Sequence, residues 1–573
     1  MFLWLGLAML LWINYETWQL DYGTRPETTT VNRDVNSSPG AEPTGLAGSI
    51  PSASETATPG LDAGSIPAPV AVPEAVASAL PAGIAPLSAD ANSTAEITAQ
   101  TDVLDLRITL RGGDLVGAQL LRYPQIKGQA ERVTLFNAAP QVFYLLQTGL
   151  TDASGEPRPT HLASFTSDSL QYRLNDSQDE LRIPLTWVDA DRGVTVVKTY
   201  VLRRGQYRID VEYDIDNRGE APWRAASYAQ ILRDDLPVER SMFNVESYAF
   251  QGPAYYDGTR YEKLDRDSAE DRALSRDITG GWIAGMQHHF VTAVVPAADR
   301  PYRYTLRTDG NQYLLSTAGS SFVVAPQSGS RITETLFVGP KLQAELETTG
   351  PRLDLVADYG MFTLLAKPLF WLLEQANKWV NNWGGAIILV TFLLKLVFYP
   401  LSEASGKSMA KMRVLGPRIK NLQETYKDDR EKLGRAMMDL YKREKINPLA
   451  GCLPILLQMP VFLAFYWVLL ESVEMRQAPF AFWIQDLSSR DPFFVLPIIM
   501  AGAMFVQYKL NPTPPDPIQA KVFMILPIVM SLTFAFFPAG LVLYWVTNTL
   551  LTIAQQWNIN RRIEAQAKKA RSA

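Results

Sequence analysis

The sequence predicts a protein in two parts: a multi-pass α-helical membrane bundle and a large antiparallel β domain. Apolar runs cluster in the first 20 residues and after residue 360, and the polar stretch between them shows repeated strand patterns. The 573 residues include one Cys and three His, which leaves no disulfide framework and little for a metal centre or a His-based triad. Most classes of enzyme are therefore disfavoured.

The first two segments are a predicted anchor and a predicted linker. Residues 2–20 are apolar, with Trp near both ends and no basic residue ahead of them, which favours a retained membrane helix over a cleaved signal peptide. Residues 21–100 follow. From residue 23 this segment has ten prolines, eight acidic residues and two basic residues, and it has no aromatic residue. Such a composition cannot bury enough apolar surface to offset the entropy of ordering, so we expect a disordered acidic linker.

Residues 101–345 are predicted to form an antiparallel sandwich. Apolar and charged residues alternate through residues 207–216, which is typical of a strand with one buried face, and the run VTVVKTYVL at 194–202 is its expected partner. Two further hairpins are expected at 107–120 and at 302–315, the second with Asp-Gly at its turn.

The pattern changes to helices near residue 360. Residues 361–381 are predicted to form an amphipathic helix at the membrane interface, because apolar residues recur at steps of three and four: Phe362, Leu365, Leu369, Leu372, Ala376 and Val380. Five membrane spans are expected at 383–401, 449–470, 493–508, 522–537 and 541–557. With the anchor, the expected count is six.

The charges of the loops predict the topology. Residues 402–447 carry 12 basic and 7 acidic residues, and the tail 558–573 carries five basic residues against one acidic residue. Residues 471–491 carry two basic and four acidic residues. Basic loops remain on the cytoplasmic side, so both termini are expected in the cytoplasm and the β domain outside it. Apolar stripes within 402–447 predict an antiparallel helical hairpin.

Lys395 is the most informative single residue. It lies within an apolar span, where a lysine costs ~2.5–3.5 kcal/mol on insertion scales unless water or a polar partner compensates. Its side chain could snorkel to the cytoplasmic headgroups, since Pro400 follows five residues later. Thr391, one turn earlier on the same face, favours an inward-facing polar site instead.

Polar residues also mark one face of the last span. They are spaced at four, four and three residues: Tyr544, Asn548, Thr552 and Gln555. Gln458 lies in the third span. Taken singly, such residues are most simply explained by hydrogen bonds between helices. Together with Lys395 they could line a cationic, hydrated cavity that lowers the cost of bringing acidic or polar peptide segments into the bilayer.

Motifs for energy coupling and catalysis are missing from the sequence. Gly406-Lys407-Ser408 resembles the end of a phosphate-binding loop, but Leu401 occupies the position of the required earlier glycine. No HExxH, nucleophile elbow or dinucleotide fingerprint occurs. We therefore expect no cofactor, no metal, no catalytic residue and no enzymatic activity.

Three segments resemble the YidC/Oxa/Alb family of membrane protein insertases: NPLAGCLPILLQMPVFLAFYWVL (447–469), residues 471–500 and FPAGLVLYWVTNTLLTIAQQW (537–557). The resemblance implies an inner-membrane protein with a periplasmic β-supersandwich domain, and a core of five helices at 383–557 around a hydrophilic groove. The groove residues that follow from the resemblance and from the polar face are Lys395, Thr391, Gln458, Tyr544, Trp545 and Asn548. Two positions depart from the family pattern, because Lys395 replaces the commoner Arg and Trp545 stands where Tyr is frequent.

The resemblance implies an insertase and chaperone that acts without nucleotide hydrolysis, alone or with the Sec translocon. The implied partners are nascent membrane proteins, the Sec translocon with its accessory proteins, the ribosome and membrane lipids. Two rival functions remain open on the residues alone: a membrane transporter or channel, and a membrane-anchored periplasmic carbohydrate-binding protein or enzyme.

Overall fold

The structure is a computed structural model that describes residues 45–51, 87–88, 95–138, 143–152, 156–234, 249–426, 429–444, 453–510 and 517–572. The predicted anchor at 2–20 and the greater part of the predicted linker lie outside the described residues.

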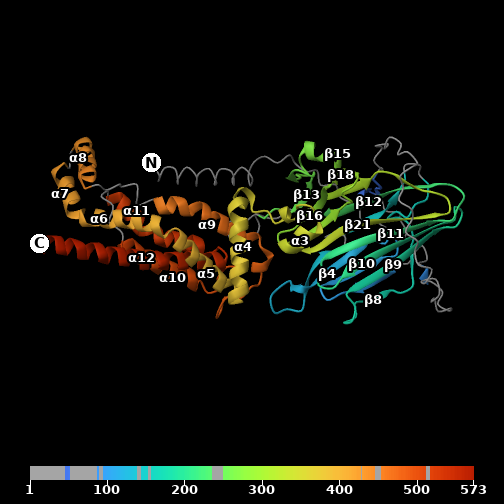
Figure 1. Cartoon of the computed structure of the whole chain (residues 1–573), viewed down its shortest axis with the longest axis horizontal. Helices are drawn as coiled ribbons and strands as arrows, with labels where there is room; N and C mark the ends of the chain where they lie inside the picture. The colour runs from blue at the N-terminus through green and yellow to red at the C-terminus, as the bar shows by residue number, and fades with distance from the viewer. Residues whose placement is uncertain are drawn as a thin grey trace. The chain divides into compact units, whose positions relative to one another are not determined.

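The described residues of the β domain contain 21 strands (Figure 1). Their bounds are β1 (Leu87–Ser88), β2 (Glu96–Gln100), β3 (Leu104–Thr109), β4 (Leu115–Pro124), β5 (Arg132–Phe136), β6 (Tyr144–Thr151), β7 (Thr166–Ser167), β8 (Gln171–Arg173), β9 (Glu180–Asp189), β10 (Val194–Arg203), β11 (Arg208–Asn217), β12 (Trp223–Asp234), β13 (Gly252–Tyr256), β14 (Tyr261–Lys263), β15 (Ser275–Thr279), β16 (Trp282–Met286), β17 (Phe290–Val295), β18 (Pro301–Asp309), β19 (Gln312–Gly319), β20 (Phe322–Val324) and β21 (Ser328–Pro340).

The three hairpins expected from the sequence all form. β10 pairs with β11, β3 with β4, and β18 with β19, each antiparallel. Gly310, at the turn of the third hairpin, has a φ of +57°, a conformation in which a residue without Cβ has no steric penalty.

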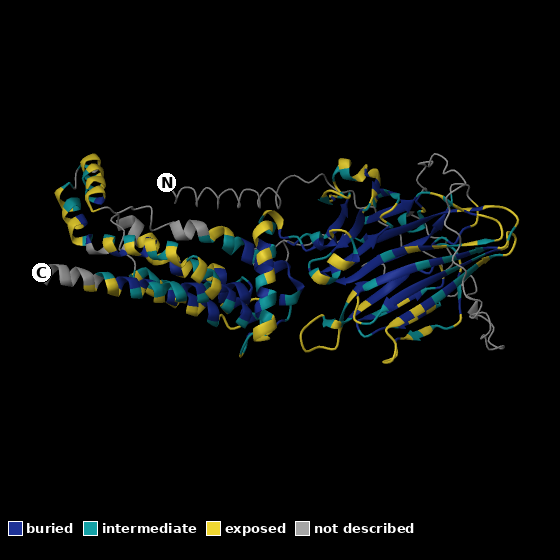
Figure 2. Cartoon of the chain, in the orientation of Figure 1, coloured by how far each residue is buried: buried dark blue, intermediate teal, exposed yellow. Residues whose placement is uncertain are grey.

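Two large sheets result. One has the strand order β1-β7-β9-β10-β11-β21-β17-β16-β13-β14, and the other has the order β15-β18-β19-β12-β6-β4-β3-β2-β8, with β20 and β5 paired to β12 and β4. The pairing of β2 with β8 is parallel. Successive side chains of a strand point to opposite faces, so alternate residues of both sheets meet in one core. Figure 2 shows the strands largely in the buried colour, and Trp282, Tyr200 and Phe136 are fully buried there. The expected antiparallel sandwich is confirmed.

The domain begins earlier than expected. β2 lies inside the range 21–100 that the sequence assigned to the linker, and its buried residues Ile97 and Ala99 belong to the core. Residues 45–51 of the same range also have a defined conformation, with the short 3-10 helix η1 at Gly45–Gly48.

The helices lie mostly in the C-terminal part. Their bounds are α2 (Ala269–Arg272), α3 (Gln343–Thr349), α4 (Thr363–Val380), α5 (Trp383–Val397), α6 (Tyr399–Val414), α7 (Gly416–Thr425), α8 (Arg430–Arg443), α9 (Leu453–Glu471), α10 (Val495–Leu510), α11 (Pro517–Phe534) and α12 (Ala539–Ser572). Short 3-10 turns occur at η4 (Leu353–Val356), η5 (Gly360–Phe362) and η7 (Val473–Met475).

α4 corresponds to the predicted interfacial helix, but its buried face differs from the predicted stripe. Leu369 and Ala376 are buried as expected, whereas Leu365 and Val380 are 40% and 44% exposed. The buried face also includes residues that the stripe omitted: Ala366, Phe370 and Leu373. The helix therefore has apolar residues both on its packed face and on its open face, and periodicity alone could not tell which face packs.

Large apolar side chains are exposed along the other helices. α10 and α11 include Ile498, Ile528 and Leu532, each about two-thirds exposed. Within the described part of the chain, no single helix reaches the length and apolarity needed to cross a membrane, while α5 and α6 together do so as a pair bent by 66°. The expected count of six spans is not established by these helices.

The predicted helical hairpin is present between α6 and α9. α7 and α8 pack through a small cluster of Leu415, Ile419 and Tyr441. Met412, Met437 and Leu440 pack against this cluster, as the two stripes in the sequence predicted.

Candidate functional site

α5 starts at a side-chain cap and ends near the middle of the helical part. The Asn382 side chain accepts a hydrogen bond from the Gly385 backbone N–H at 2.9 Å, which satisfies a donor that the first turn leaves free. The helix continues through an apolar run to Val397, and Pro400 lies in the first turn of α6, where a missing N–H is tolerated. α5 packs against α12, and α6 packs against both α12 and α9.

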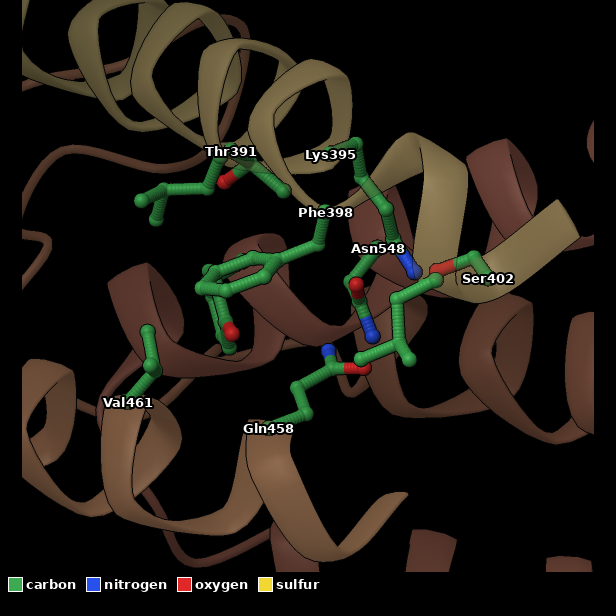
Figure 3. Close-up of a pocket in the computed structure, with 10 residues that line it drawn as sticks. Thr391, Lys395, Phe398, Ser402, Gln458, Val461 and Asn548 are labelled. Carbon is green, nitrogen blue, oxygen red and sulfur yellow. The ribbon is translucent and has the colours of Figure 1, made fainter. Parts of the chain in front are cut away.

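A hollow lies at the bend between α5 and α6, bordered by these two helices, α9 and α12. Five of the six predicted groove residues line it: Thr391, Lys395, Gln458, Tyr544 and Asn548. The remaining lining residues are Leu394, Phe398, Leu401, Ser402 and Val461. Figure 3 shows the Lys395 amine and the amides of Gln458 and Asn548 directed toward the same space. Residues from four separate helices therefore bring a cluster of polar groups together in one partly apolar hollow.

Lys395 faces this hollow. Its Nζ donates a hydrogen bond to Thr552 Oγ1 at 2.9 Å, and Thr552 Oγ1 in turn donates to the Asn548 carbonyl at 2.7 Å. Within the described residues, no carboxylate forms an ion pair with Lys395. An ammonium group has three N–H donors, so a cation bound by one neutral hydroxyl can still bind an incoming acceptor.

The other polar residues are held in fixed positions. Thr391 is 1% exposed, and its Oγ1 donates to the Ile387 carbonyl at 2.6 Å, so the hydroxyl oxygen remains as an acceptor. The Tyr544 hydroxyl hydrogen-bonds the Gln458 side chain, and its ring stacks on Phe465 with centroids 4.6 Å apart. These contacts fix the side chains of Thr391, Gln458 and Tyr544 against their neighbours.

Trp545 does not line the hollow. Its ring lies against Phe462 and Phe534, with centroids 4.9 and 5.2 Å away. The sequence analysis missed the other five lining residues, among them Ser402 and Phe398. Ser402 follows Lys395 by seven residues, which is two helical turns, so this spacing could have identified it as a residue on the same face. Phe398 lies at the bend between α5 and α6, and no comparable pattern pointed to it.

No metal centre accompanies the hollow. Among the described residues, no group of three or more His, Cys, Asp or Glu side chains is placed to bind a metal ion.

Two family descriptions match the chain. Residues 96–372 match the family described as "YidC periplasmic domain", and residues 375–567 match the family described as "60Kd inner membrane protein". These matches define the class: an inner membrane protein that carries a periplasmic β domain.

Relatives cover nearly the whole chain. A Thioalkalivibrio sulfidiphilus protein named "Membrane protein insertase YidC" is 45% identical over 582 residues, 99% of each chain. The protein of the same name from Alkalilimnicola ehrlichii is 48% identical over 82% of this chain and 84% of its own. The chain belongs to the YidC family of membrane protein insertases. A solved structure described as "Active YidC insertase crystal structure with the first transmembrane domain resolved" is similar with a TM-score of 0.36 and 18% identity, over 81% of this chain and 92% of that one.

The family membership confirms the resemblance drawn from the three segments at 447–557. It does not favour the two rival functions, because the matching relatives are named as insertases.

Proposed function

We propose that the hollow around Lys395 is the groove in which this insertase receives the polar segment of a client membrane protein. The observation that carries the proposal is the lysine itself, which is held by a neutral hydroxyl and directed into a hollow that also contains the amides of Gln458 and Asn548. An acidic or polar peptide segment gains charge-assisted hydrogen bonds there and loses less solvation energy than it would in lipid.

The apolar helix of the client then moves into lipid along α9 and α11. The exposed apolar residues of α11 support this path, since they offer a contact surface for such a helix: Met524, Ile525, Ile528, Val529 and Leu532. Partition of the client helix into lipid, together with the membrane potential for acidic segments, drives the reaction, and no nucleotide or metal takes part.

The other assignments follow from the loop charges and the family. The protein is a multi-pass inner membrane protein with six spans and with both termini in the cytoplasm. The α7–α8 hairpin and the basic tail receive the nascent client or the ribosome. The Sec translocon is a partner, and the protein acts as a chaperone for helices that leave it.

Substitution of Lys395 tests the groove directly. We expect Lys395→Met to reduce insertion of a client with an acidic external segment about tenfold or more, and to leave a client with a neutral segment nearly unaffected. Lys395→Arg keeps the charge and is the matched control, so it should insert both clients. Equal insertion of both clients by the Met variant would overturn the proposal.

Crosslinking locates the client. A photoreactive residue at position 391 or 458 should form adducts with the nascent chain during synthesis of a small membrane protein. A photoreactive residue at position 395 replaces the lysine and removes its charge. The insertion activity of this variant is therefore measured together with its adducts. Two further positions distinguish the groove from the path into lipid. Position 545 packs against Phe462 and Phe534, and position 528 is exposed on α11. Adducts only to neighbouring helices or lipid would argue against a client-binding groove.

A further inference from the structure

A short piece of the predicted linker lies against the β domain. Residues 45–51 begin with η1, which lies beside β18 and β19 and is seen as the short dark-blue segment of Figure 1. The Ser49 backbone N–H donates to the Leu46 carbonyl at 3.1 Å and closes the turn, and Pro51 is buried. This linker segment therefore has a defined position on the sheet that contains β18 and β19.

Three side chains of the β domain hold the segment. His161 Nε2 contacts the Ala47 carbonyl at 3.0 Å, and Gln230 Nε2 donates to the Ser49 carbonyl at 3.1 Å. Arg307 Nη1 donates to Ser49 Oγ at 2.7 Å. His161 and Gln230 are buried, with 3% and 0% exposure, so these contacts are not ordinary surface contacts.

The contact network fixes the tautomer of His161. Burial lowers the pKa of this imidazole to about 4, so the ring is neutral at neutral pH. Its Nε2 faces a carbonyl oxygen, which can only accept, and must therefore carry the proton. Its Nδ1 lies 2.6 Å from the Tyr228 hydroxyl, which donates to it and also accepts from the His161 backbone N–H at 2.8 Å. The ring is held as a hydrogen-bond donor toward a peptide carbonyl.

A second network orients Gln230. The Asp114 carboxylate accepts a hydrogen bond from Gln147 Nε2 at 3.1 Å, so the Gln147 carbonyl oxygen points the other way. That oxygen accepts from Gln230 Nε2 at 2.7 Å, and the same amide nitrogen donates to Ser49. Asp114 and Gln147 are each 4% exposed. Buried residues of the domain therefore orient the side-chain N–H group that Gln230 donates to Ser49.

The linker contains the bound sequence twice. Residues 47–51 read Ala-Gly-Ser-Ile-Pro, and residues 63–67 read Ala-Gly-Ser-Ile-Pro again, sixteen positions later. The second copy lies outside the described residues. We propose that His161, Gln230 and Arg307 form a peptide-binding site on the periplasmic domain for the sequence Ala-Gly-Ser-Ile-Pro, and that residues 63–67 are its second ligand.

The site contacts that sequence at four points, two through the backbone and two through the side chains of Ser49 and Pro51. Two backbone carbonyls accept from His161 and Gln230, the serine hydroxyl accepts from Arg307, and the buried proline fixes the exit of the chain. If residues 63–67 replaced residues 47–51 in the site, the part of the linker that precedes the bound copy would be sixteen residues longer. The site is separate from the hollow around Lys395, and the proposal does not depend on the role of that hollow.

A peptide-binding measurement on the full-length protein in lipid nanodiscs tests the site. The probe is a fluorescein-labelled peptide with the sequence of residues 45–54, and its control is a peptide of the same composition in scrambled order. One variant has residues 47–51 scrambled in place, and a second has both 47–51 and 63–67 scrambled. A tethered ligand competes at an effective concentration of about 1 mM, so only the doubly scrambled chain should bind the probe readily. The wild type and the singly scrambled chain should need about tenfold more probe or higher.

Side-chain variants of the doubly scrambled chain assign the binding to this site. Gln230→Leu should weaken binding of the probe about tenfold or more, and Arg307→Met, whose parent side chain is exposed, should weaken it severalfold. Failure of the doubly scrambled chain to bind the probe, or binding that neither substitution weakens, would overturn the peptide site. Equal binding by the singly and doubly scrambled chains would overturn the role of residues 63–67.

Discussion

Replacement of Glu334 by Gln should change how the stability of the β domain depends on pH. Glu334 lies on β21 opposite Val211 of β11, and it is 2% exposed. Burial raises the pKa of its carboxyl group to about 7, from 4.5 in the unfolded chain. The positive charges of Lys198 and Arg300 act in the opposite direction and are smaller effects.

The sign and size follow from proton linkage. A carboxyl group with a raised folded-state pKa contributes stability that is fully present below pH 4.5 and is lost as the pH rises through 7. The shift from 4.5 to about 7 corresponds to roughly 3 kcal/mol of unfolding free energy. The glutamine of the Glu334→Gln variant cannot ionise. The unfolding free energy of the variant relative to the wild type should therefore rise by about this amount between pH 4.5 and pH 8.

Pulse proteolysis in urea measures this difference for the β domain within the detergent-solubilised full chain. The comparison of variant with wild type at each pH removes the contributions of other groups. Glu347→Gln, which changes an exposed carboxylate of α3, is the control and should leave the difference constant. A Glu334→Gln difference that stays within about 1 kcal/mol across the range would refute the reasoning, because it would mean that the carboxyl group ionises without a burial penalty.

Three further substitutions test packing and hydrogen bonding. Gly112→Ala should destabilise the β domain by roughly 2–4 kcal/mol in the same urea assay, because φ is +78° and a Cβ would lie 2.3 Å from the His161 carbonyl oxygen. Asp491→Ala should lower the midpoint of thermal aggregation by several degrees, because the carboxylate accepts hydrogen bonds from two backbone N–H groups and an indole N–H. Asp491→Asn should lower this midpoint by a smaller amount. Ile419→Asp should speed protease cleavage of residues 402–447 about tenfold, because it buries an unpaired charge against Tyr441; unchanged cleavage would exclude the α7–α8 packing.

Much of the fold was predictable because local patterns were strong. The alternation at 207–216 specified both a strand and the face it buries, and the partner run at 194–202 needed only a short turn. The apolar helices were also predicted, and most of their ends differ by no more than five residues. The exception is the end of α12, which continues from the predicted 557 to Ser572, through the segment predicted as a tail. The buried face of α4 was predicted only in part, since apolar residues occur around much of that helix and only its packing partners select the buried ones.

The polar residues that line the hollow were predictable to a similar degree. Lys395, Thr391, Gln458, Tyr544 and Asn548 were found because polar residues are unusual in apolar spans, and all five line the hollow. The packing of Trp545 against Phe462 had no signal in the sequence, because an aromatic residue in such a helix suits several environments equally.

The sequence by itself determined the division into a β domain and a helical part, the pairing of neighbouring strands and the residues able to make a polar site, because these depend on composition and on short-range periodicity. Only the tertiary structure decided that Lys395 turns inward to Thr552, and that residues 45–51 lie on His161, Gln230 and Arg307. Both contacts join residues more than 100 positions apart, and their energies depend on burial and geometry that no local pattern encodes.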